Sequence, residues 1–248
     1  MAARRFEGKV AFVTGGAGGI GGAISKALAQ EGALVAVADL DSDAAKELAK
    51  ALGALGLGMD VTQHDSVLSA TAQTKRELGP IELTFNVAGI VGGYAPLMTI
   101  PVDAFDHTMA VNLRGMFLVM QAASAQMIEA KKGGAFVNVG SVGGFRPGGP
   151  LAHYGISKAA VHALTTAAAR ELAQHQIRVN AIAPGPVYTP MTKEGMDDPQ
   201  QRAGWESRIP LGRIAETDDM VPLALYLASD EARNITGAIV PTDGGLGL

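Results

Sequence analysis

Short apolar runs alternate along this chain with longer segments in which an apolar residue recurs every three to four positions. Short runs that are apolar throughout are typical of strands buried on both faces, and the longer pattern is typical of amphipathic helices. Strands are predicted at residues 10–14, 34–39, 54–60, 83–87, 135–139, 178–183 and 238–242. Helices are predicted at 20–30, 42–52, 65–78, 154–175 and 217–227, with one or two more within 102–130.

This order of elements predicts an α/β protein. Strands that are apolar along their whole length need cover on both faces, and right-handed crossovers through helices place such strands in one parallel sheet. We therefore expect a doubly wound Rossmann fold with a parallel sheet of about seven strands and helices on both faces. A chain of 248 residues has a usual size for one α/β domain, so residues 1–248 are predicted to form a single domain.

A glycine-rich loop, Thr14-Gly-Gly-Ala-Gly-Gly-Ile-Gly21, follows the first strand. A helix begins in this loop, and the next strand ends at Asp39. Glycines allow a close approach to a pyrophosphate, a helix N-terminus offers free N–H groups, and a carboxylate after the second strand can bind the adenosine ribose. A P-loop fits less well, because no Gly-Lys-Ser/Thr opens the helix. The loop therefore predicts a dinucleotide site.

Composition excludes several other classes of function. The net charge is −4, and no basic block extends beyond pairs such as Arg4-Arg5, so nucleic acid has no electrostatic footprint here. The chain has no cysteine, and its five histidines lack metal-ligand spacing. The first apolar run is too short for a signal peptide, and no run approaches the ~20 residues of a membrane span. We expect a cytoplasmic protein with no metal, membrane or nucleic-acid partner.

Residues 190–210 interrupt the alternation of strands and helices. The segment mixes Gly, Pro and charged residues, and it carries Met191, Met196 and the only tryptophan, Trp205. A loop of this length is either disordered or functional. Because it follows the strand at 178–183, it lies at the edge of the sheet where ligands bind, and we favour a substrate lid.

Four polar residues are candidates for chemistry. Tyr154 and Lys158 are spaced i and i+4 and share a helix face, Ser141 follows the strand at 135–139, and Asn112 lies in an otherwise apolar helical stretch. Each has an ordinary structural interpretation: a solvated surface pair, a turn former, and a backbone-bonded amide. Only their combination with the glycine loop points to catalysis.

Together these features resemble the short-chain dehydrogenase/reductase family, over essentially the whole chain. The glycine loop fits the family's Thr-Gly-x3-Gly-x-Gly motif, and Asn86-Val-Ala-Gly89 is similar to its Asn-Asn-Ala-Gly motif, with Val87 in place of the second asparagine. We expect this departure to weaken local stability and to spare the chemistry. Further matches are Asp60-Val61, Pro184-Gly185, Thr189, Pro210-Leu-Gly-Arg213 and Asp243-Gly-Gly245.

The resemblance implies a catalytic tetrad of Asn112, Ser141, Tyr154 and Lys158. Tyr154 would be the general acid/base of alcohol oxidation, its pKa lowered from about 10 by Lys158 and by the nicotinamide ring. Ser141 would hydrogen-bond the substrate oxygen, and Asn112 would hold a water of a proton relay. The implied cofactor-binding residues are Gly15, Gly18, Gly19, Ile20, Asp39, Leu40, Asp60, Val61, Asn86, Ala88, Gly89, Tyr154, Lys158, Pro184, Gly185, Val187 and Thr189.

The cofactor is predicted to be NAD rather than NADP. A 2′-phosphate would meet the like charge of Asp39, and neither the glycine loop nor Leu40 and Asp41 supply a cation. We therefore expect an NAD-dependent alcohol dehydrogenase of class EC 1.1.1.-. Two alternatives stay open: an NADPH-dependent enzyme like the 3-oxoacyl-carrier-protein reductases, and a nucleotide sensor that has lost catalysis.

The resemblance also implies a substrate pocket and an oligomer. The pocket residues are Ser141, Gly143, Leu151, Tyr154, Tyr188, Met191 and Trp205, which are mostly small, apolar or aromatic, so we expect a neutral secondary alcohol or ketone. Arg146 is expected on the surface. The family resemblance implies a homotetramer, and the Ala- and Thr-rich helix at 159–173 would permit close packing between subunits.

Overall fold

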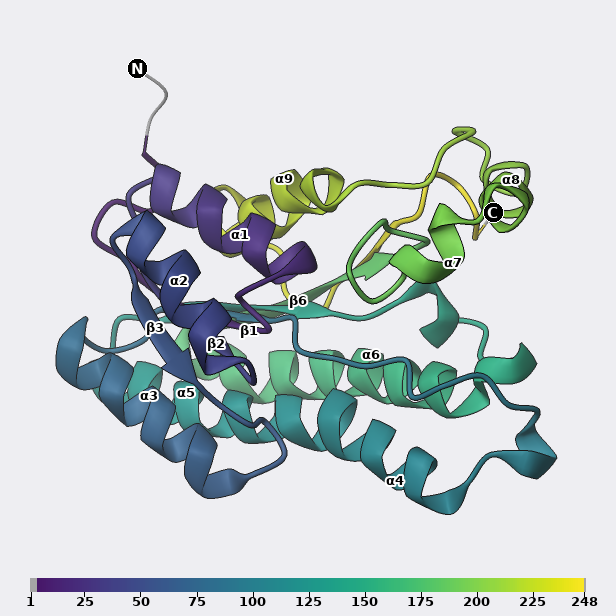
Figure 1. Cartoon of the computed structure of the whole chain (residues 1–248). Helices are drawn as coiled ribbons and strands as arrows, with labels where there is room; N and C mark the ends of the chain where they lie inside the picture. Colours follow the sequence, from purple (N-terminus) through teal and green to yellow (C-terminus); the bar gives the residue numbers. More distant parts are fainter. Residues whose placement is uncertain (1–3, 248) are drawn as a thin grey trace.

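Within residues 4–247, which the computed structural model describes, seven parallel strands form one sheet in the order β3-β2-β1-β4-β5-β6-β7 (Figure 1). This confirms the predicted doubly wound α/β fold. The ends of the predicted domain, residues 1–3 and 248, lie outside the described residues. The strands are β1 Val10–Thr14, β2 Leu34–Asp39, β3 Leu55–Gly58, β4 Leu83–Asn86, β5 Gly134–Val139, β6 Ile177–Pro184 and β7 Ile239–Thr242.

Helices cover both faces of the sheet. In Figure 1, α1 and α9 lie above the sheet, whereas α3, α4, α5 and α6 lie below it. The helices are α1 Gly19–Gln30, α2 Ser42–Leu52, α3 His64–Glu77, α4 Val102–Met109, α5 Met116–Ala130, α6 Ala152–Leu172, α7 Lys193–Asp197, α8 Pro199–Glu206 and α9 Thr217–Ala228.

Four strands, β1, β2, β5 and β6, supply side chains to two hydrophobic cores, one on each face of the sheet. In β1, Ala11 and Val13 pack with α1, α2 and α9, whereas Val10 and Phe12 pack with α3, α5 and α6. Successive strand residues point to opposite faces, so a strand between two helical layers has to be apolar at every position. This is the physical reason for the continuous apolar runs in the sequence.

The chain between 102 and 130, for which one or two helices were predicted, forms two. Helices α4 and α5 are separated by a π-helical turn, Ala110–Gly115. Asn112 lies in this turn and is completely buried. Such turns insert an extra residue into a helix and often occur at functional sites.

Residues 190–210 were predicted as a long loop, which is wrong in part, because the segment contains helices α7 and α8. Asp198 caps α8 by accepting hydrogen bonds from the N–H groups of Gln200 and Gln201, and Pro199 occupies the first helical position. Asp followed by Pro is a helix start signal as much as a turn signal. The sequence interpretation considered only the composition of the segment and expected a loop.

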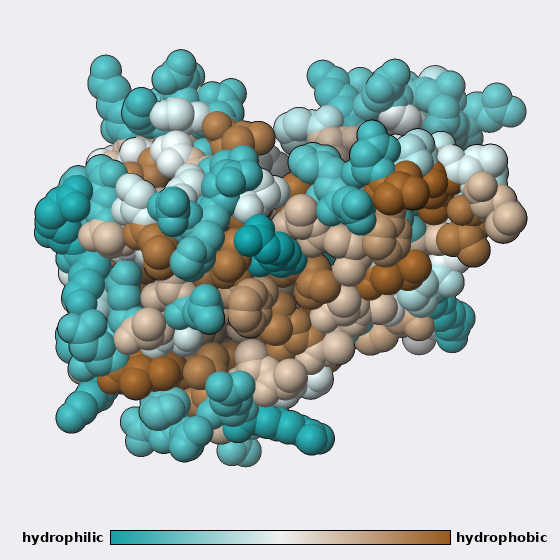
Figure 2. All heavy atoms as spheres, turned by 90° about the horizontal axis from the view of Figure 1, so that it is seen from below, coloured by the Kyte–Doolittle hydropathy of each residue, from teal (hydrophilic) through white to brown (hydrophobic). Residues whose placement is uncertain are grey.

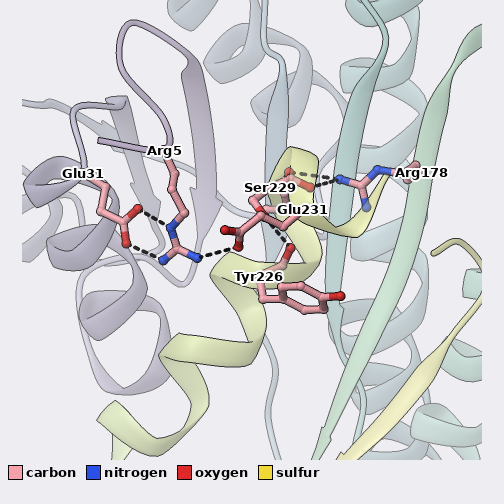
Figure 3. A network of polar contacts seen from close by, with 7 residues as sticks. Arg5, Glu31, Arg178, Tyr226, Ser229 and Glu231 are labelled. Atoms are coloured by element: carbon pink, nitrogen blue, oxygen red, sulfur yellow. Dashed lines mark hydrogen bonds and ion pairs between the residues drawn. The ribbon is translucent and has the colours of Figure 1, made fainter. Parts of the chain in front are cut away.

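Polar contacts fasten the first described residues and the end of α9 to the body of the domain (Figure 3). Arg5 donates a hydrogen bond of 2.6 Å to Glu31 at the end of α1, and its guanidinium lies 3.6 Å from Glu231. Arg178 of β6 donates to the backbone carbonyls of Leu227, Ala228 and Ser229, where α9 ends. These contacts lie at the amino ends of the strands, which leaves the carboxyl ends free of them.

Candidate active site

A cavity of about 550 Å³ opens at the carboxyl ends of the strands. Strand ends and loops after β1 to β6 supply most of its walls, and α1, α4, the π-helical turn and α6 supply the rest. The predicted cofactor residues that line it are Gly15, Gly18, Gly19, Ile20, Asp39, Leu40, Asp60, Val61, Ala88, Gly89, Tyr154, Lys158, Pro184, Gly185, Val187 and Thr189. Thus the fold brings into one cavity residues that are as much as 177 positions apart in the sequence (Gly15 to Thr192).

The glycine loop between β1 and α1 forms one end of the cavity. Gly15 has φ +60°, and a Cβ atom there would lie 3.0 Å from the backbone of Ala88. A Cβ on Gly18, by contrast, would meet nothing within 4 Å among the described residues. Gly15 is therefore required by packing between the ends of β1 and β4, while Gly18 leaves open space at the N-terminus of α1. Free N–H groups and the helix dipole make that space suited to a pyrophosphate.

Asp39 and Asp60 lie on the same side of the cavity. The Asp39 carboxylate accepts hydrogen bonds from the backbone N–H of Ala17 (3.0 Å) and of Asp41 (3.2 Å). Asp60 accepts from the N–H and hydroxyl groups of Thr62, at 2.8 and 2.7 Å. Backbone donors thus hold Asp39 in place at the end of β2, where a ribose could bind. The glycine loop, the open helix terminus and this carboxylate together fit a nicotinamide dinucleotide.

Tyr154 and Lys158 line the opposite part of the cavity, one helical turn apart on α6. The Lys158 Nζ atom is buried, donates a 2.9 Å hydrogen bond to the Val139 carbonyl, and lies 5.8 Å from the centroid of the Tyr154 ring. Ser141 follows β5, and its Oγ accepts a 3.1 Å hydrogen bond from the Gly143 N–H. The three predicted reacting side chains therefore come from two neighbouring elements, β5 and α6.

Burial governs the charge of both titratable groups. It lowers the pKa of Lys158 to about 8 and raises the pKa of Tyr154; the Ser141 hydroxyl, which can stabilise the phenolate, opposes the second effect. In the protein alone the pKa of Tyr154 is therefore raised overall, because burial is the largest contribution. The expected lowering of this pKa by Lys158 together with the nicotinamide ring stays a prediction.

Asn112 does not line the cavity but supports it from behind. Its side-chain amide donates to the Ile90 carbonyl and to Ser157 Oγ, and its Oδ1 accepts from the Ile90 N–H at 2.8 Å. A Cβ on Gly89 would lie 3.3 Å from Asn112 Oδ1 and 3.5 Å from Lys158 Nζ. Asn112 and Lys158 therefore approach the same glycine, and the role of Asn112 in a proton relay stays a prediction.

The side chain of Asn86 points into the sheet and is absent from the cavity lining in the described part of the chain. It is buried and donates a 2.9 Å hydrogen bond to Asn138 on β5. Val87, the departure from the family motif, lines the cavity and also packs against the core beneath α1. Sequence spacing alone does not distinguish these neighbours, because residues next to each other at a strand end point to opposite sides.

Of the predicted substrate residues, Tyr154 and Met191 line the cavity, whereas Ser141, Gly143, Leu151, Tyr188 and Trp205 lie outside its lining. Tyr188 donates a 2.8 Å hydrogen bond to Asp197 on α7, and the Trp205 ring stacks with Arg208 at 5.0 Å. Arg146 is exposed, as expected. The predicted substrate residues thus form no single pocket with the cofactor residues.

Sequence reasoning missed other residues of the cavity wall. Most directly adjoin a predicted residue along the chain, which is the signal that could have found them. His107 and Val139 lack that signal, because only the positions of α4 and of the end of β5 bring them to the cavity. The missed residues are Met59, Thr62, Val87, Ile90, His107, Val111, Val139, Gly140, Pro190 and Thr192.

Comparison with known proteins identifies the family of this chain. Residues 15–247 match a family model described as enoyl-(acyl carrier protein) reductase. The chain belongs to the short-chain dehydrogenase/reductase family. It is 38% identical to a 3-oxoacyl-[acyl-carrier-protein] reductase of Thermotoga maritima, over 98% of this chain and 99% of that protein. It is 35% identical to an L-rhamnose 1-dehydrogenase (NAD(P)(+)) of a Sphingomonas species, over 97% and 96%.

A solved structure of the same family was obtained with a nicotinamide cofactor. The 3-ketoacyl-(acyl-carrier-protein) reductase of Brucella melitensis, complexed with NADH, is 31% identical and matches with a TM-score of 0.91 over 98% of this chain and 99% of that one. As a family member, the chain is an oxidoreductase for alcohol or ketone substrates that uses a nicotinamide cofactor. Within residues 4–247, no helix has the combination of length and apolar character that crossing a membrane requires.

Proposed function

We propose that this family member is an NAD-dependent dehydrogenase/reductase that interconverts a neutral secondary alcohol and its ketone. One observation carries the proposal: Asp39 and the pair Tyr154–Lys158 line the same cavity. The carboxylate suits the adenosine end of NAD, and the phenol and ammonium suit the reacting end. The bound nicotinamide would accept a hydride from the alcohol carbon or return it to the ketone.

Tyr154 transfers the proton in this proposal. Burial raises its pKa, so the free protein holds the phenol, the form that donates a proton to a ketone oxygen. Oxidation needs the phenolate, which positive charge near the ring favours, including that of Lys158. Ser141 would hydrogen-bond the substrate oxygen, one residue beyond Gly140 of the cavity wall.

Asp39 supports NAD over NADP. Its carboxylate is held by two backbone N–H groups, so a 2′-phosphate at the same ribose would meet a fixed negative charge. The family relatives are divided on this point, since one bears NAD(P)(+) in its name and another was solved with NADH. The alternative is an NADPH-dependent 3-oxoacyl-carrier-protein reductase. The similarity to the Thermotoga protein favours this alternative. Asp39 opposes it, and so does the net charge of −4, because a chain of this charge would repel an acidic partner protein.

The segment 190–210 serves as a substrate lid in this proposal. Its first residues, Pro190 and Met191, line the cavity, and Met191 is 54% exposed. Further along, Met196 and Ile209 are buried with Ile214, which follows the segment, in a small core apart from those of the sheet. A segment that packs mainly outside the cores of the sheet and has a partly exposed apolar edge can move over a bound substrate.

The assembly is a homotetramer in this proposal. The face seen from below in Figure 2 carries a broad apolar area, and exposed apolar side chains lie on the helices that cover this side of the sheet. Phe105 of α4, Phe117 and Ile128 of α5 and Ile156 of α6 are each between 36% and 47% exposed. Apolar areas of this kind favour burial between subunits. Sedimentation at micromolar concentration tests this part, and a stable monomer would exclude it.

Two measurements test the proposed function. Fluorescence titration with NADH and NADPH should give clearly tighter binding of NADH. Turnover with NAD on a panel of neutral secondary alcohols should then detect oxidation, with a 3-oxoacyl thioester and NADPH as the comparison. Preference for the thioester and NADPH would support the alternative, and tight NADH binding without turnover on any member would support a nucleotide sensor.

A further inference from the structure

Helix α6 carries a buried histidine that the proposed chemistry does not use. His162 follows Lys158 by one helical turn, and only 9% of its surface is exposed. Its Nε2 atom is buried and has no hydrogen-bond partner among residues 4–247. Leaving a buried polar atom unpaired costs free energy, and an apolar side chain would avoid that cost. A histidine at this buried position therefore needs an explanation that depends on the shape of its ring.

The imidazole fills the space left by two glycines of the loop after β5. A Cβ on Gly140 would lie 2.5 Å from His162 Nε2, and one on Gly144 would lie 2.7 Å from His162 Cε1. The ring of Phe145 packs on the imidazole, with centroids 4.6 Å apart. His162 thus touches both ends of the loop 140–145, and Ser141 lies between these contacts.

The same loop rests directly on the backbone of α6. A Cβ on Gly144 would lie 2.8 Å from the carbonyl carbon of Lys158, and a Cβ on Gly155 would lie 3.2 Å from the carbonyl oxygen of Gly143. Neither side can shift without moving the other, because such contacts leave no free space. The loop with Ser141 and the helical turn with Tyr154 and Lys158 therefore form one packed unit, and His162 closes its far end.

The charge of His162 agrees with this packing role. Burial and the nearby Lys158 ammonium both lower the pKa of His162, which keeps the ring neutral at neutral pH. A neutral ring adds no second positive charge beside Lys158. It also avoids the larger cost of a charged group without a hydrogen-bond partner.

We propose that His162 is a positioning residue, which holds the loop 140–145 so that Ser141 stays in register with Tyr154. This inference rests on the proposed function of Ser141. The ring is flat enough to lie between Gly140 and Phe145, and a branched aliphatic side chain is not. Its loss should therefore affect turnover more than binding.

Substitution of His162 separates positioning from general stability. His162→Leu should lower kcat about 10- to 100-fold, with KM, the NADH Kd and Tm changed much less. His162→Gln, which places a flat amide in the same space, should recover at least a third of the wild-type kcat. His175→Gln, at an exposed site just beyond α6, is the matched control and should leave all four quantities unchanged. Unchanged kcat in His162→Leu, or a parallel loss of NADH binding and Tm, would overturn the proposal.

A double-variant cycle with Ser141 identifies the residue through which His162 acts. Ser141→Ala should lower kcat at least as much as His162→Leu, and adding His162→Leu to Ser141→Ala should produce no more than a twofold further loss. If His162→Leu lowered kcat in the double variant as much as it does in the wild type, the proposal that His162 acts through Ser141 would be overturned. Full activity in Ser141→Ala would instead contradict the proposed function, so the two failures are distinguishable.

A second cycle tests the contact itself and needs no turnover. Gly140→Ala should lower Tm by several degrees, because the new methyl group would overlap the imidazole. His162→Ala in the same chain should recover most of that loss, since the overlap is removed and the next neighbour, the Ile182 carbonyl oxygen, lies 3.4 Å away. Equal Tm losses for Gly140→Ala in both backgrounds would show that the contact does not exist.

Discussion

The cavity walls and the segment 190–210 are built in different ways. The walls are strand ends, held by sheet hydrogen bonds and by short side-chain contacts such as those of Thr14, whose Oγ1 accepts from the N–H groups of Val87 and Ala88. The segment 190–210 is attached through a few side chains, among them buried Met196 and the Tyr188–Asp197 hydrogen bond. Trp205, its largest side chain, is 37% exposed.

This difference separates two tasks. Groups that bind the cofactor and transfer the proton need fixed positions, and a parallel sheet provides them. A surface that accepts different substrates needs to move and to vary, and a segment that packs mainly in a small core apart from those of the sheet can do so without disturbing the sheet. Substitutions in the walls should therefore change chemistry or cofactor choice strongly, and substitutions in the segment should change substrate binding mildly.

The largest effect is expected for Tyr154→Phe, in the wall. The ring keeps its packing on α6 and only the proton carrier is lost, so kcat should fall by about 10²- to 10⁴-fold. NADH binding should stay within about twofold of wild type, as measured by fluorescence titration. If the variant kept more than a few per cent of the activity, Tyr154 would not be the general acid/base.

A smaller effect, on binding, is expected for Asp39→Ala. The variant loses a charge-assisted hydrogen bond to ribose, worth roughly 1.5–3 kcal/mol, so NADH should bind about 10- to 150-fold more weakly. The affinity for NADPH should fall less, or should rise, because the repulsion between Asp39 and the 2′-phosphate disappears. Asp41→Ala, two residues further and exposed, is the control and should keep the NADH preference. The same preference in Asp39→Ala would show that another residue selects the cofactor.

Lys158→Met should raise stability while it removes activity. Burial lowers the pKa of Lys158 from 10.5 to about 8, so keeping this side chain charged in the folded wild type costs about 3 kcal/mol of stability at pH 7. The variant avoids this cost but loses the hydrogen bond to the Val139 carbonyl, which offsets about 1 kcal/mol of the stability gained. Between pH 8 and 10.5 the unfolded wild type binds the proton that the folded protein has lost, so wild-type stability from this group rises with pH.

Urea unfolding at two pH values checks this prediction. Lys158→Met should be about 1–2 kcal/mol more stable to unfolding than wild type at pH 7, and this difference in stability should be smaller at pH 9.5. Lys26→Met, at an exposed position of α1, is the control and should show no such narrowing. A variant less stable than wild type at both pH values would mean that Lys158 stabilises the fold.

The smallest effect is expected for Trp205→Ala, in the segment 190–210. Loss of a partly exposed contact surface should cost about 1 kcal/mol of substrate binding, or roughly fivefold in KM, with kcat changed less. Trp205 is the only tryptophan, so its emission should also change when substrate is added to the wild-type enzyme–cofactor complex. Identical emission with and without substrate, together with normal kinetics of the variant, would leave Trp205 as a packing residue of α8.

Several parts of this molecule could be predicted from the sequence, because local rules determine them. Runs such as 10–13 and 34–38 are apolar at every position since both faces of the strand are covered, and that property is visible without a structure. The glycine loop and Asp39 are similarly local, since their spacing is set by one strand, one loop and one helix. The helices α7 and α8 were missed because Asp198-Pro199 signals a turn and a helix start equally well.

The sequence by itself determined the order of strands and helices, the dinucleotide loop and the residue types available for proton transfer, since these depend on neighbours along the chain. Only the tertiary structure decided which side each strand-end residue faces: Asn86 into the sheet, and Val87 into the cavity. The tertiary structure also decided the charge of Lys158 and Tyr154, because desolvation depends on everything packed around a group. The contact of His162 with Gly140 and Gly144 belongs to the same class, since only the packing of α6 against the loop after β5 brings these residues together.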